Sequence, residues 1–390
     1  MVNSNSLHAA MRDQVDQQFL PCVSTALLRG REVVDTYCYG YADKETRVAL
    51  REDHIFRAFS NTKLATSSAA LLLWEEGRFQ LDDPIDQYIP ELANRHVLRP
   101  NATRIEDTEP ARSRITIRQL MTHTSGLSYG IFDPGTVLFA AYNKAAVGSP
   151  TKTLQEQVNT LATLPLAFHP GARWEYSRAT DVLGRLIEVV SGEGFGTFLA
   201  RRIFEPLGMV DTDFYVPESK ASRFTTLYVG VDIADPTKPG LLRADDKPYP
   251  GAYLKRMANE SGGGGLVTTL GDTVRLIQSL QADGPTLLKP ETIALMGTNQ
   301  LPTGQWVEFP NIPPMVGRGF GLGSSVAVSP GPLDPEEIAS EVSWGGLAGT
   351  SWWYNPRLNI AGVLMTQRYF GQGNPFVIAF KQQAYKAFGY

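Results

Sequence analysis

Phe59-Ser60-Asn61-Thr62-Lys63 opens the stretch of sequence that decides the fold, and the stretch continues as Leu64-Ala65-Thr66-Ser67-Ser68-Ala69-Ala70-Leu71-Leu72-Leu73-Trp74-Glu75-Glu76-Gly77. Residues 63–76 are rich in alanine and leucine and contain neither proline nor glycine, a composition that favours a helix. Gly77 stands where a helix needs a residue of positive φ to end it. The stretch therefore predicts a mostly apolar, buried helix with Ser60 at its amino-terminal end.

Ser60 and Lys63 are three positions apart, so their side chains lie on one face of such a helix. A buried amine is poorly stabilised as a cation, so its pKa falls towards neutrality and it can accept a proton. The N–H groups of the first helical turn lack partners within the helix and can bind a developing oxyanion. Taken alone, the pattern also fits a capping serine followed by a solvated lysine, and the rest of the chain must decide.

The composition is that of an ordinary soluble globular protein. Of 390 residues, 43% are hydrophobic and 19% charged, and the net charge is −4; this length suits two lobes. The charge, with no cluster of lysine and arginine, predicts neither a nucleic acid nor an anionic membrane as partner. Residues 1–8 show no signal peptide and no apolar run could span a bilayer, so we expect a cytoplasmic protein.

The chain has two cysteines, Cys22 and Cys38, which flank a turn expected at residues 29–32. Counting residues outward from that turn places the two side chains on opposite faces of a hairpin, which argues against a disulfide between them. We therefore expect two free thiols.

The order of the expected elements predicts an α+β protein. Helices are expected at residues 6–19, 63–76, 115–122, 154–163, 181–203 (in two pieces), 272–280 and 376–388, and strands at 23–28, 32–39, 319–328, 341–345, 350–354 and 360–366. A polar surface insertion is expected at 98–113. We expect residues 1–58 and 245–390 to form an α/β lobe with an antiparallel sheet, and residues 59–244 to form an inserted, mainly helical lobe. The active site would lie in the cleft between the lobes.

Two other patterns suggest different chemistry but lack the context that it needs. Gly126-Leu127-Ser128-Tyr129-Gly130 matches the nucleophile elbow, which requires a strand before the serine and a helix after it, and neither is expected here. The glycine runs at 262–265 and 319–323 lack the partners of a phosphate or dinucleotide site, so they predict tight turns and close backbone packing. No His/Cys/Asp/Glu cluster has the spacing of metal ligands, so we expect neither a metal nor a cofactor.

Tyr176 and the segment Ser343-Trp344-Gly345-Gly346-Leu347 are the remaining candidates. Tyr176 precedes an expected helix, and a tyrosine whose pKa is lowered by a lysine ammonium can serve as an acid or base. The two glycines allow a substrate to approach the strand, where the N–H of Leu347 would complete an oxyanion hole with that of Ser60. A packed tyrosine and a strand bulge are the structural alternatives.

Together these residues carry a resemblance. Ser60-x-x-Lys63, Tyr176-Ser177 and Trp344-Gly345-Gly346 occur in the order and spacing of the serine β-lactamase and penicillin-binding protein superfamily. The flanks at residues 120–127, 206–209 and 262–269 look similar too, so the resemblance covers nearly the whole chain. Within the superfamily the chain resembles most the family VIII carboxylesterases, and next the side-chain acyltransferases of polyketide biosynthesis.

The resemblance implies a β-lactamase-like fold, with an antiparallel sheet flanked by helices. It also implies Ser60 as the nucleophile that forms an acyl-enzyme and Lys63 with Tyr176 as the proton-transfer pair. The amides of Ser60 and Leu347 would form the oxyanion hole.

Two departures from the superfamily's pattern bear on the substrate. Arg178 stands where penicillin-recognising members have the asparagine of Tyr-x-Asn, and Trp344 stands where they have a lysine or histidine. Without that cation a penicillin carboxylate lacks a partner, whereas Trp344 adds apolar surface for an uncharged group. The sequence leaves open whether Arg178 enters the site or leans into solvent.

Residues 128–152 are rich in glycine, proline and aromatic residues, and they predict a wall over the pocket. We expect the substrate to contact Tyr129 in this wall, together with Arg178 and the segment Trp344, Gly345 and Gly346.

The sequence thus predicts a serine carboxylesterase that hydrolyses esters of short to medium acyl chains through an acyl-enzyme. Acyl transfer to a second alcohol and weak β-lactamase or D-aminopeptidase activity are alternatives within the same chemistry. A catalytically silent scaffold is the alternative outside enzymes. The expected partner is a small ester.

Overall fold

An antiparallel sheet of eight strands holds the chain together, and both ends of the chain contribute to it. The structure, a computed structural model, describes residues 2–281, 283–310, 314–371 and 373–390. Across the sheet the order is β10-β11-β12-β13-β14-β1-β2-β3. The strands are β1 (Cys22–Arg29), β2 (Glu32–Asp43), β3 (Val48–Ala49), β10 (Arg318–Phe320), β11 (Ser325–Ala327), β12 (Val342–Gly345), β13 (Ser351–Asn355) and β14 (Ile360–Met365). The predicted α+β class and antiparallel sheet are confirmed.

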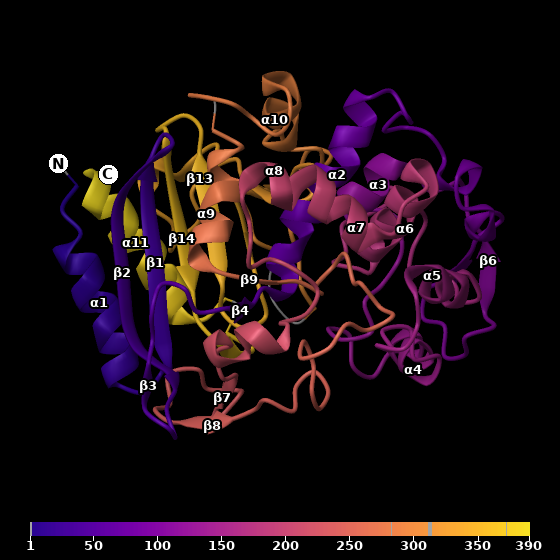
Figure 1. The fold of residues 1–390 in the computed structure, drawn as a ribbon. Coiled ribbons are helices and arrows are strands. Elements are labelled where there is room, and N and C mark those ends of the chain that lie inside the picture. Colours follow the sequence, from indigo (N-terminus) through magenta and orange to yellow (C-terminus); the bar gives the residue numbers. More distant parts are fainter. Residues whose placement is uncertain (1, 282, 311–313, 372) are drawn as a thin grey trace.

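Helices cover both faces of this sheet (Figure 1). On the outer face, α1 (Asn5–Asp16) packs against α11 (Pro375–Phe388), and apolar residues of both helices join Val23 and Leu27 of β1 in one cluster. On the inner face, α9 (Leu270–Gln278) contacts β14 and β1. Because β14 is buried along its whole length, its sequence is a continuous apolar run without alternation.

The hairpin of β1 and β2 corrects one prediction. The register shifts between Leu27 and Leu28, so that Ser24 faces Cys38 and Cys22 faces Gly40. One extra residue in a strand reverses which face every later side chain occupies. Cys22 and Cys38 therefore lie on the same face, and the prediction of opposite faces is wrong because the bulge was not foreseen. Both cysteines are nevertheless free thiols, as predicted.

The predicted strand over 319–328 is a hairpin instead. β10 and β11 pair with each other, and Gly323 has φ of +97° in the turn between them, a value that favours glycine. The glycine run at 319–323 thus forms a tight turn, as predicted, but the turn divides the strand. The predicted insertion at 98–113 contains β6 (Thr108–Pro110), which pairs with β5 (His96–Leu98) at the start of this segment.

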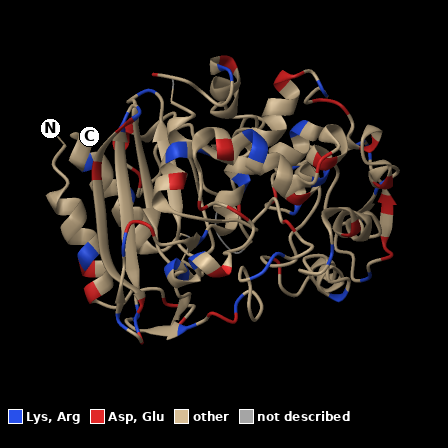
Figure 2. Ribbon diagram, viewed as in Figure 1, with Lys and Arg blue, Asp and Glu red and all other residues tan. Residues whose placement is uncertain are grey.

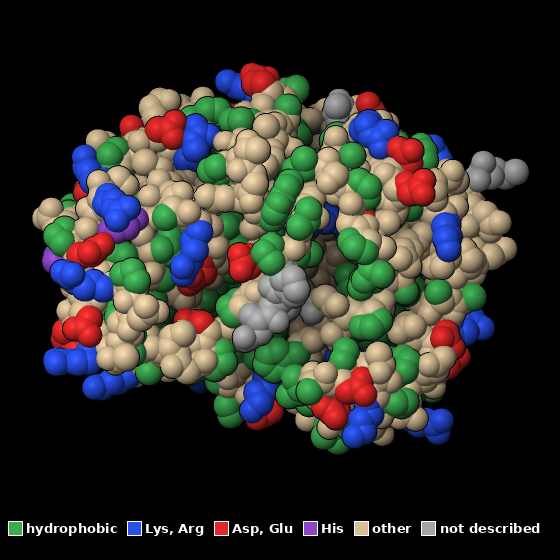
Figure 3. Space-filling model, turned by 180° about the vertical axis from the view of Figure 1, so that it is seen from behind, with side chains coloured by type: hydrophobic (Ala, Val, Ile, Leu, Met, Phe, Trp, Pro, Cys, Tyr) green, Lys and Arg blue, Asp and Glu red, His purple; other side chains and the backbone are tan. Residues whose placement is uncertain are grey.

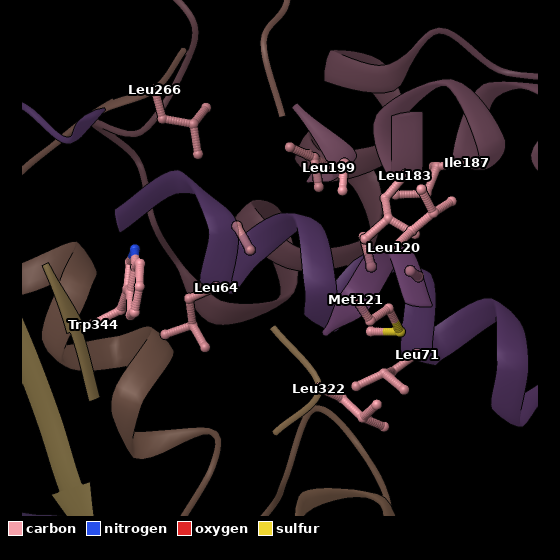
Figure 4. Packing of buried hydrophobic residues seen from close by; sticks show 14 of the residues in the cluster. Leu64, Leu71, Leu120, Met121, Leu183, Ile187, Leu199, Leu266, Leu322 and Trp344 are labelled. Carbon is pink, nitrogen blue, oxygen red and sulfur yellow. The ribbon is translucent and has the colours of Figure 1, made fainter. Parts of the chain in front are cut away.

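α2 (Thr62–Glu75) is the central helix of the remaining, mainly helical part. It is buried from Thr62 to Leu73 and packs against α6 (Ala179–Ser191) and α7 (Phe195–Leu199). Figure 4 shows its apolar side chains between those of α6 and α7 on one side and Leu322 on another. Gly77 has φ of +71° and ends the helix as predicted.

The other elements surround this core. The helices are α3 (Ile117–Met121), α4 (Val137–Lys144), α5 (Leu154–Ala162), α8 (Glu205–Leu207) and α10 (Pro290–Met296), and the short strands are β4 (Phe56–Arg57), β7 (Tyr228–Gly230), β8 (Leu241–Arg243), β9 (Val267–Thr268) and β15 (Arg368–Tyr369). β15, β7 and β8 form a small sheet. The lobe boundaries drawn from the sequence, at 58/59 and 244/245, stay a prediction.

Acidic and basic residues are interspersed over both parts of the ribbon (Figure 2). Within the ranges that the structure describes, none of the helices combines the length and apolar character needed to cross a bilayer.

Candidate active site

Ser60 lies in a short 3₁₀ turn, Phe59–Asn61, immediately before α2. The backbone just before Ser60 is held in place by two contacts. β4 pairs with β9, and the Ala58 N–H donates to the carbonyl of Leu266 over 2.9 Å. The preceding residue, Phe59, has φ of +44°, a conformation that costs energy for a bulky side chain and is typical of functional turns. Ser60 is 9% exposed and lines a cleft of about 360 Å³.

Lys63 is brought to Ser60 as the sequence predicted. Its Nζ lies 3.5 Å from Ser60 Oγ and donates a hydrogen bond to the carbonyl oxygen of Gly263 over 2.6 Å. The side chain is 1% exposed. Burial is the main cause that lowers the pKa of Lys63 to about 7, with the positive charge of Arg178 acting in the same direction and Asp181 opposing. Near neutral pH this amine can therefore accept a proton.

Tyr176 completes the group, since its hydroxyl donates to Ser60 Oγ over 2.8 Å. Lys63 Nζ lies 4.5 Å from the centre of its ring. Burial raises the pKa of Tyr176 well above its usual value, so the prediction that the lysine would lower this pKa is wrong. The physical reason is that a buried phenolate loses its hydration, and the hydrogen bond with Ser60, which lowers the pKa, does not offset that loss. Tyr176 is thus a neutral phenol that can donate a proton.

Asp181, in the first turn of α6, is a member of the site that sequence reasoning missed. Its fully buried carboxylate accepts hydrogen bonds from Ser261 Oγ at 2.6 Å and from the Gly263 N–H at 3.0 Å. Burial alone would raise the pKa of Asp181, but Arg178 and these hydrogen bonds outweigh it and lower the pKa. The available signal was an acidic residue in the first turn of an otherwise apolar helix face.

The glycine run 262–265 also belongs to the site. Hydroxyl groups of α2 hold it, because Thr66 Oγ1 donates to the carbonyl of Gly262 and Thr62 Oγ1 accepts from the Leu266 N–H. A Cβ at position 262 would lie 2.6 Å from the carbonyl oxygen of Thr180, so the predicted close packing is real. The prediction did not foresee that this packing places the Gly263 carbonyl against Lys63.

Leu347 lines the same cleft as Ser60. It follows β12, and a Cβ on the preceding Gly346 would lie 2.4 Å from the carbonyl oxygen of Ala58. The absence of a side chain at Gly346 therefore lets the end of this strand approach the turn that carries Ser60. The structure brings together the two residues whose amides the sequence assigned to an oxyanion hole.

Trp344 occupies a different place from the one expected. It is 7% exposed, and it is not one of the described residues that line the cleft. Its ring packs 5.3 Å from that of Tyr176 and 5.4 Å from that of Phe320, and its indole nitrogen points towards the amino-terminal end of α2 (Figure 4). Trp344 thus supports Tyr176 from behind.

Aromatic side chains form the wall of the cleft, as predicted for the segment 128–152. Tyr129 stacks on Tyr176 with ring centres 5.3 Å apart, and Phe132 packs against both. The remaining described lining residues are mostly apolar or aromatic: Phe59, Ile131, Gly148, Pro150, Arg178, Phe214, Pro248, Tyr249, Tyr253, Met257, Asn259, Ser261, Gly264, Gly265 and Tyr369. Figure 3 shows hydrophobic side chains gathered around a hollow on the rear face.

Arg178 enters this cleft rather than leaning into solvent. Its side chain is 14% exposed, its Nη1 lies 3.3 Å from Asp181 Oδ2, and its guanidinium carbon lies 4.7 Å from the centre of the Tyr129 ring.

Ser128 of the nucleophile-elbow pattern lies in a loop and is 2% exposed, without the strand and helix that an elbow requires. Within the described ranges, no three His, Cys, Asp or Glu side chains cluster in a way that could hold a metal ion.

Comparison with known proteins gives a consistent result. The family model described as Beta-lactamase matches residues 7–384. Protein Rv1367c of Mycobacterium tuberculosis (strain ATCC 25618 / H37Rv) is 34% identical over 374 residues, which cover 94% of this chain and 90% of that protein. Esterase EstB of Burkholderia gladioli is 31% identical over 371 residues, which cover 92% and 88%.

Among solved structures, EstCE1, described as a hydrolase with promiscuous acyltransferase activity, superposes with a TM-score of 0.81. The match covers 98% of both chains at 24% sequence identity, so it shows that the fold is the same.

Proposed function

Since the chain belongs to the beta-lactamase family and is a serine hydrolase, we propose that it is a carboxylesterase for short to medium acyl esters, with Ser60, Lys63 and Tyr176 as its catalytic residues. One observation carries the proposal: Ser60 Oγ lies 2.8 Å from the Tyr176 hydroxyl and 3.5 Å from an amine with a pKa of about 7. A nucleophile with a proton acceptor and a proton donor on either side is the arrangement that acyl transfer requires.

The proton steps follow from the two pKa shifts. Lys63, neutral above pH 7, takes the proton of Ser60 as Oγ attacks the ester carbonyl and forms the new C–O bond. When the bond to the alcohol breaks, Tyr176 gives its proton to the departing alkoxide and is reprotonated from Lys63. Water then attacks the acyl-enzyme by the same route and releases the acid with Ser60 restored.

The oxyanion formed in each attack would accept hydrogen bonds from the amides of Ser60 and Leu347. Among the described residues, the Leu347 N–H has no hydrogen bond to the protein, so it is free to donate. Donors held in a water-poor cleft stabilise this charge without having to reorient.

The aromatic cleft supports an ester with apolar groups on at least one side, and Tyr129 would contact it. Esterase EstB, at 31% identity over most of both chains, bears a name that agrees with this reaction. The apolar surface for an uncharged group, which the sequence assigned to Trp344, would come instead from wall residues such as Phe132 and Ile131.

Acyl transfer is the second candidate. It uses the same acyl-enzyme, and a second alcohol bound in the cleft would replace water. The low water content expected of a cleft lined with aromatic residues favours it, since deacylation by water then slows.

The test compares p-nitrophenyl butyrate with nitrocefin as substrates of the wild type and of Ser60→Ala. We expect turnover of the ester, little of the β-lactam, and loss of ester turnover in the variant. Ester turnover that survives Ser60→Ala would exclude Ser60 as nucleophile, and equal turnover of nitrocefin would contradict the preference for esters. Added alcohol that raises release of p-nitrophenol and yields the new ester would favour acyl transfer.

A further inference from the structure

Arg178 is the only charged residue among the described residues that line the cleft. An arginine in an aromatic pocket is costly unless its donors find acceptors, because a guanidinium keeps its charge and carries five N–H groups. Its place beside the nucleophile therefore needs an explanation in terms of what binds there.

The described residues supply few hydrogen-bond acceptors to the guanidinium of Arg178. Nη1 has one long hydrogen bond of 3.3 Å to Asp181, and the face of the guanidinium lies on the ring of Tyr129. Nε is buried without a hydrogen-bond partner, and within the described ranges Nη2 has none either. Buried polar groups are ordinarily paired, so this edge of Arg178 lacks an acceptor that the described residues do not supply.

The backbone is shaped to hold Arg178 in place. A Cβ at Gly148 would lie 2.3 Å from Nη2 and 2.9 Å from the guanidinium carbon. Gly148 also lines the cleft, so the guanidinium fills the space that a side chain at position 148 would take. Arg178 is thus held between Gly148, Tyr129 and Asp181, and it lines the cleft with 14% of its side chain exposed.

We propose that Arg178 binds a carboxylate that the ester substrate carries away from its reacting carbonyl, so that the preferred substrates are half-esters of dicarboxylic acids or similar anionic esters. The fork of a guanidinium matches a carboxylate better than any other side chain does, and charge-assisted hydrogen bonds are the strongest available to it. The apolar wall would hold the chain between the two groups. This inference rests on the proposed esterase function and names its substrate class.

The experiment compares p-nitrophenyl butyrate with the mono-p-nitrophenyl esters of succinic, glutaric and adipic acid and with their methyl-capped diesters. We expect kcat/KM of the wild type for the best acid-terminated ester to exceed that for butyrate and for the matching diester by about tenfold or more, as for other charge-assisted pairs. Arg178→Met should abolish this preference and Arg178→Lys should keep part of it, because a lysine supplies the charge without the fork. Arg173→Met, at an exposed arginine paired with Glu175, is the matched control and should keep it.

Two results would overturn the inference: a wild type that prefers the neutral esters, or an Arg178→Met variant that loses activity on all esters equally. Binding separates this inference from the esterase proposal. Calorimetry measures the affinity of the Ser60→Ala protein for monomethyl glutarate without turnover. We expect binding, and we expect Arg178→Met, added to Ser60→Ala, to weaken this affinity at least about tenfold. Binding without hydrolysis by the wild type would refute the esterase proposal alone, and hydrolysis without dependence on Arg178 would refute the carboxylate site alone.

Discussion

The amine of Lys63 donates to the carbonyl oxygen of Gly263 over 2.6 Å, although the two residues are 200 positions apart in the chain. The same glycine donates its N–H to Asp181. One peptide segment therefore connects the amine to a buried carboxylate, and it holds one N–H of the amine away from Ser60. The lone pair of neutral Lys63 is left to face the serine hydroxyl, so the amine can act as its base.

The pH dependence of acylation should report the state of Lys63. Because its pKa is about 7, kcat/KM for p-nitrophenyl butyrate should rise with pH through a midpoint near that value and then reach a plateau. Asp181 stabilises the ammonium form, so Asp181→Asn should move the midpoint to lower pH. Asp211→Asn, which alters a carboxylate paired with Arg223 elsewhere, should leave the midpoint in place. An unmoved midpoint in Asp181→Asn would contradict this electrostatic role.

Lys63 should reduce the stability of the fold. The pKa of Lys63 is lower in the folded chain than in the unfolded chain. Below pH 7 the folded state therefore carries a buried ammonium, and the full cost of burying this charge reduces the stability of the fold. Each unit of pKa difference corresponds to about 1.4 kcal/mol. Lys63→Met should therefore be inactive but unfold at a higher temperature at pH 6. The gain should shrink as the pH rises from 7 towards the lysine's usual value, and a gain independent of pH would point to packing instead.

Tyr176 should act through its hydroxyl. Tyr176→Phe keeps the ring that stacks on Tyr129 but removes the proton donor, so acylation should fall by about 10²–10⁴-fold. Acid release from ethyl butyrate, whose ethoxide must be protonated to leave, measures this role, and circular dichroism checks the fold. Tyr228→Phe, at a buried tyrosine bonded to Glu45, is the control and should acylate normally. Acylation at the wild-type rate in Tyr176→Phe would remove this residue from the mechanism.

Trp344 should matter for packing more than for substrate contact. Trp344→Ala removes a buried ring from the cluster around Tyr176 and Phe320, so it should cost about 3–5 kcal/mol of unfolding free energy, measured by urea denaturation. Trp74→Ala, at a partly buried tryptophan, should cost less. KM values that change strongly in Trp344→Phe, with stability intact, would instead support a direct contact with substrate.

Gly346 should be required for the oxyanion hole. A methyl group at this position meets the Ala58 carbonyl at 2.4 Å and Thr350 Oγ1 at 2.2 Å, so Gly346→Ala should displace Leu347. We expect kcat to fall by about 10²–10³-fold, as for loss of one donor, with a smaller change in KM. Gly194→Ala, which meets only Thr197 Oγ1 at 3.9 Å, should be nearly neutral. A normal kcat in a folded Gly346→Ala protein would argue against the Leu347 amide.

Several features follow from local sequence alone. The apolar run after Lys63 and the glycine at its end predict α2, because helix propensity and the positive φ of a C-terminal glycine are local properties. The pairing of Ser60 with Lys63 is equally local, since it needs only one turn of helix. The C-terminal strands and the last helix were predicted for similar reasons.

Features that depend on register or on burial were not predictable in this way. The faces of Cys22 and Cys38 depend on one extra residue in a strand. The division of 319–328 into two strands depends on the turn at Gly323, and the direction of the Tyr176 pKa depends on how much water its surroundings exclude.

The sequence by itself thus determined the class of fold and the residue types that meet at Ser60, because motif order and periodicity are properties of the chain. Only the tertiary structure decided that Trp344 supports Tyr176 from behind, that Arg178 faces the cleft, and that Asp181 and Gly263 hold Lys63. These are contacts between segments far apart in the chain, where packing determines the direction of each side chain and burial determines its charge.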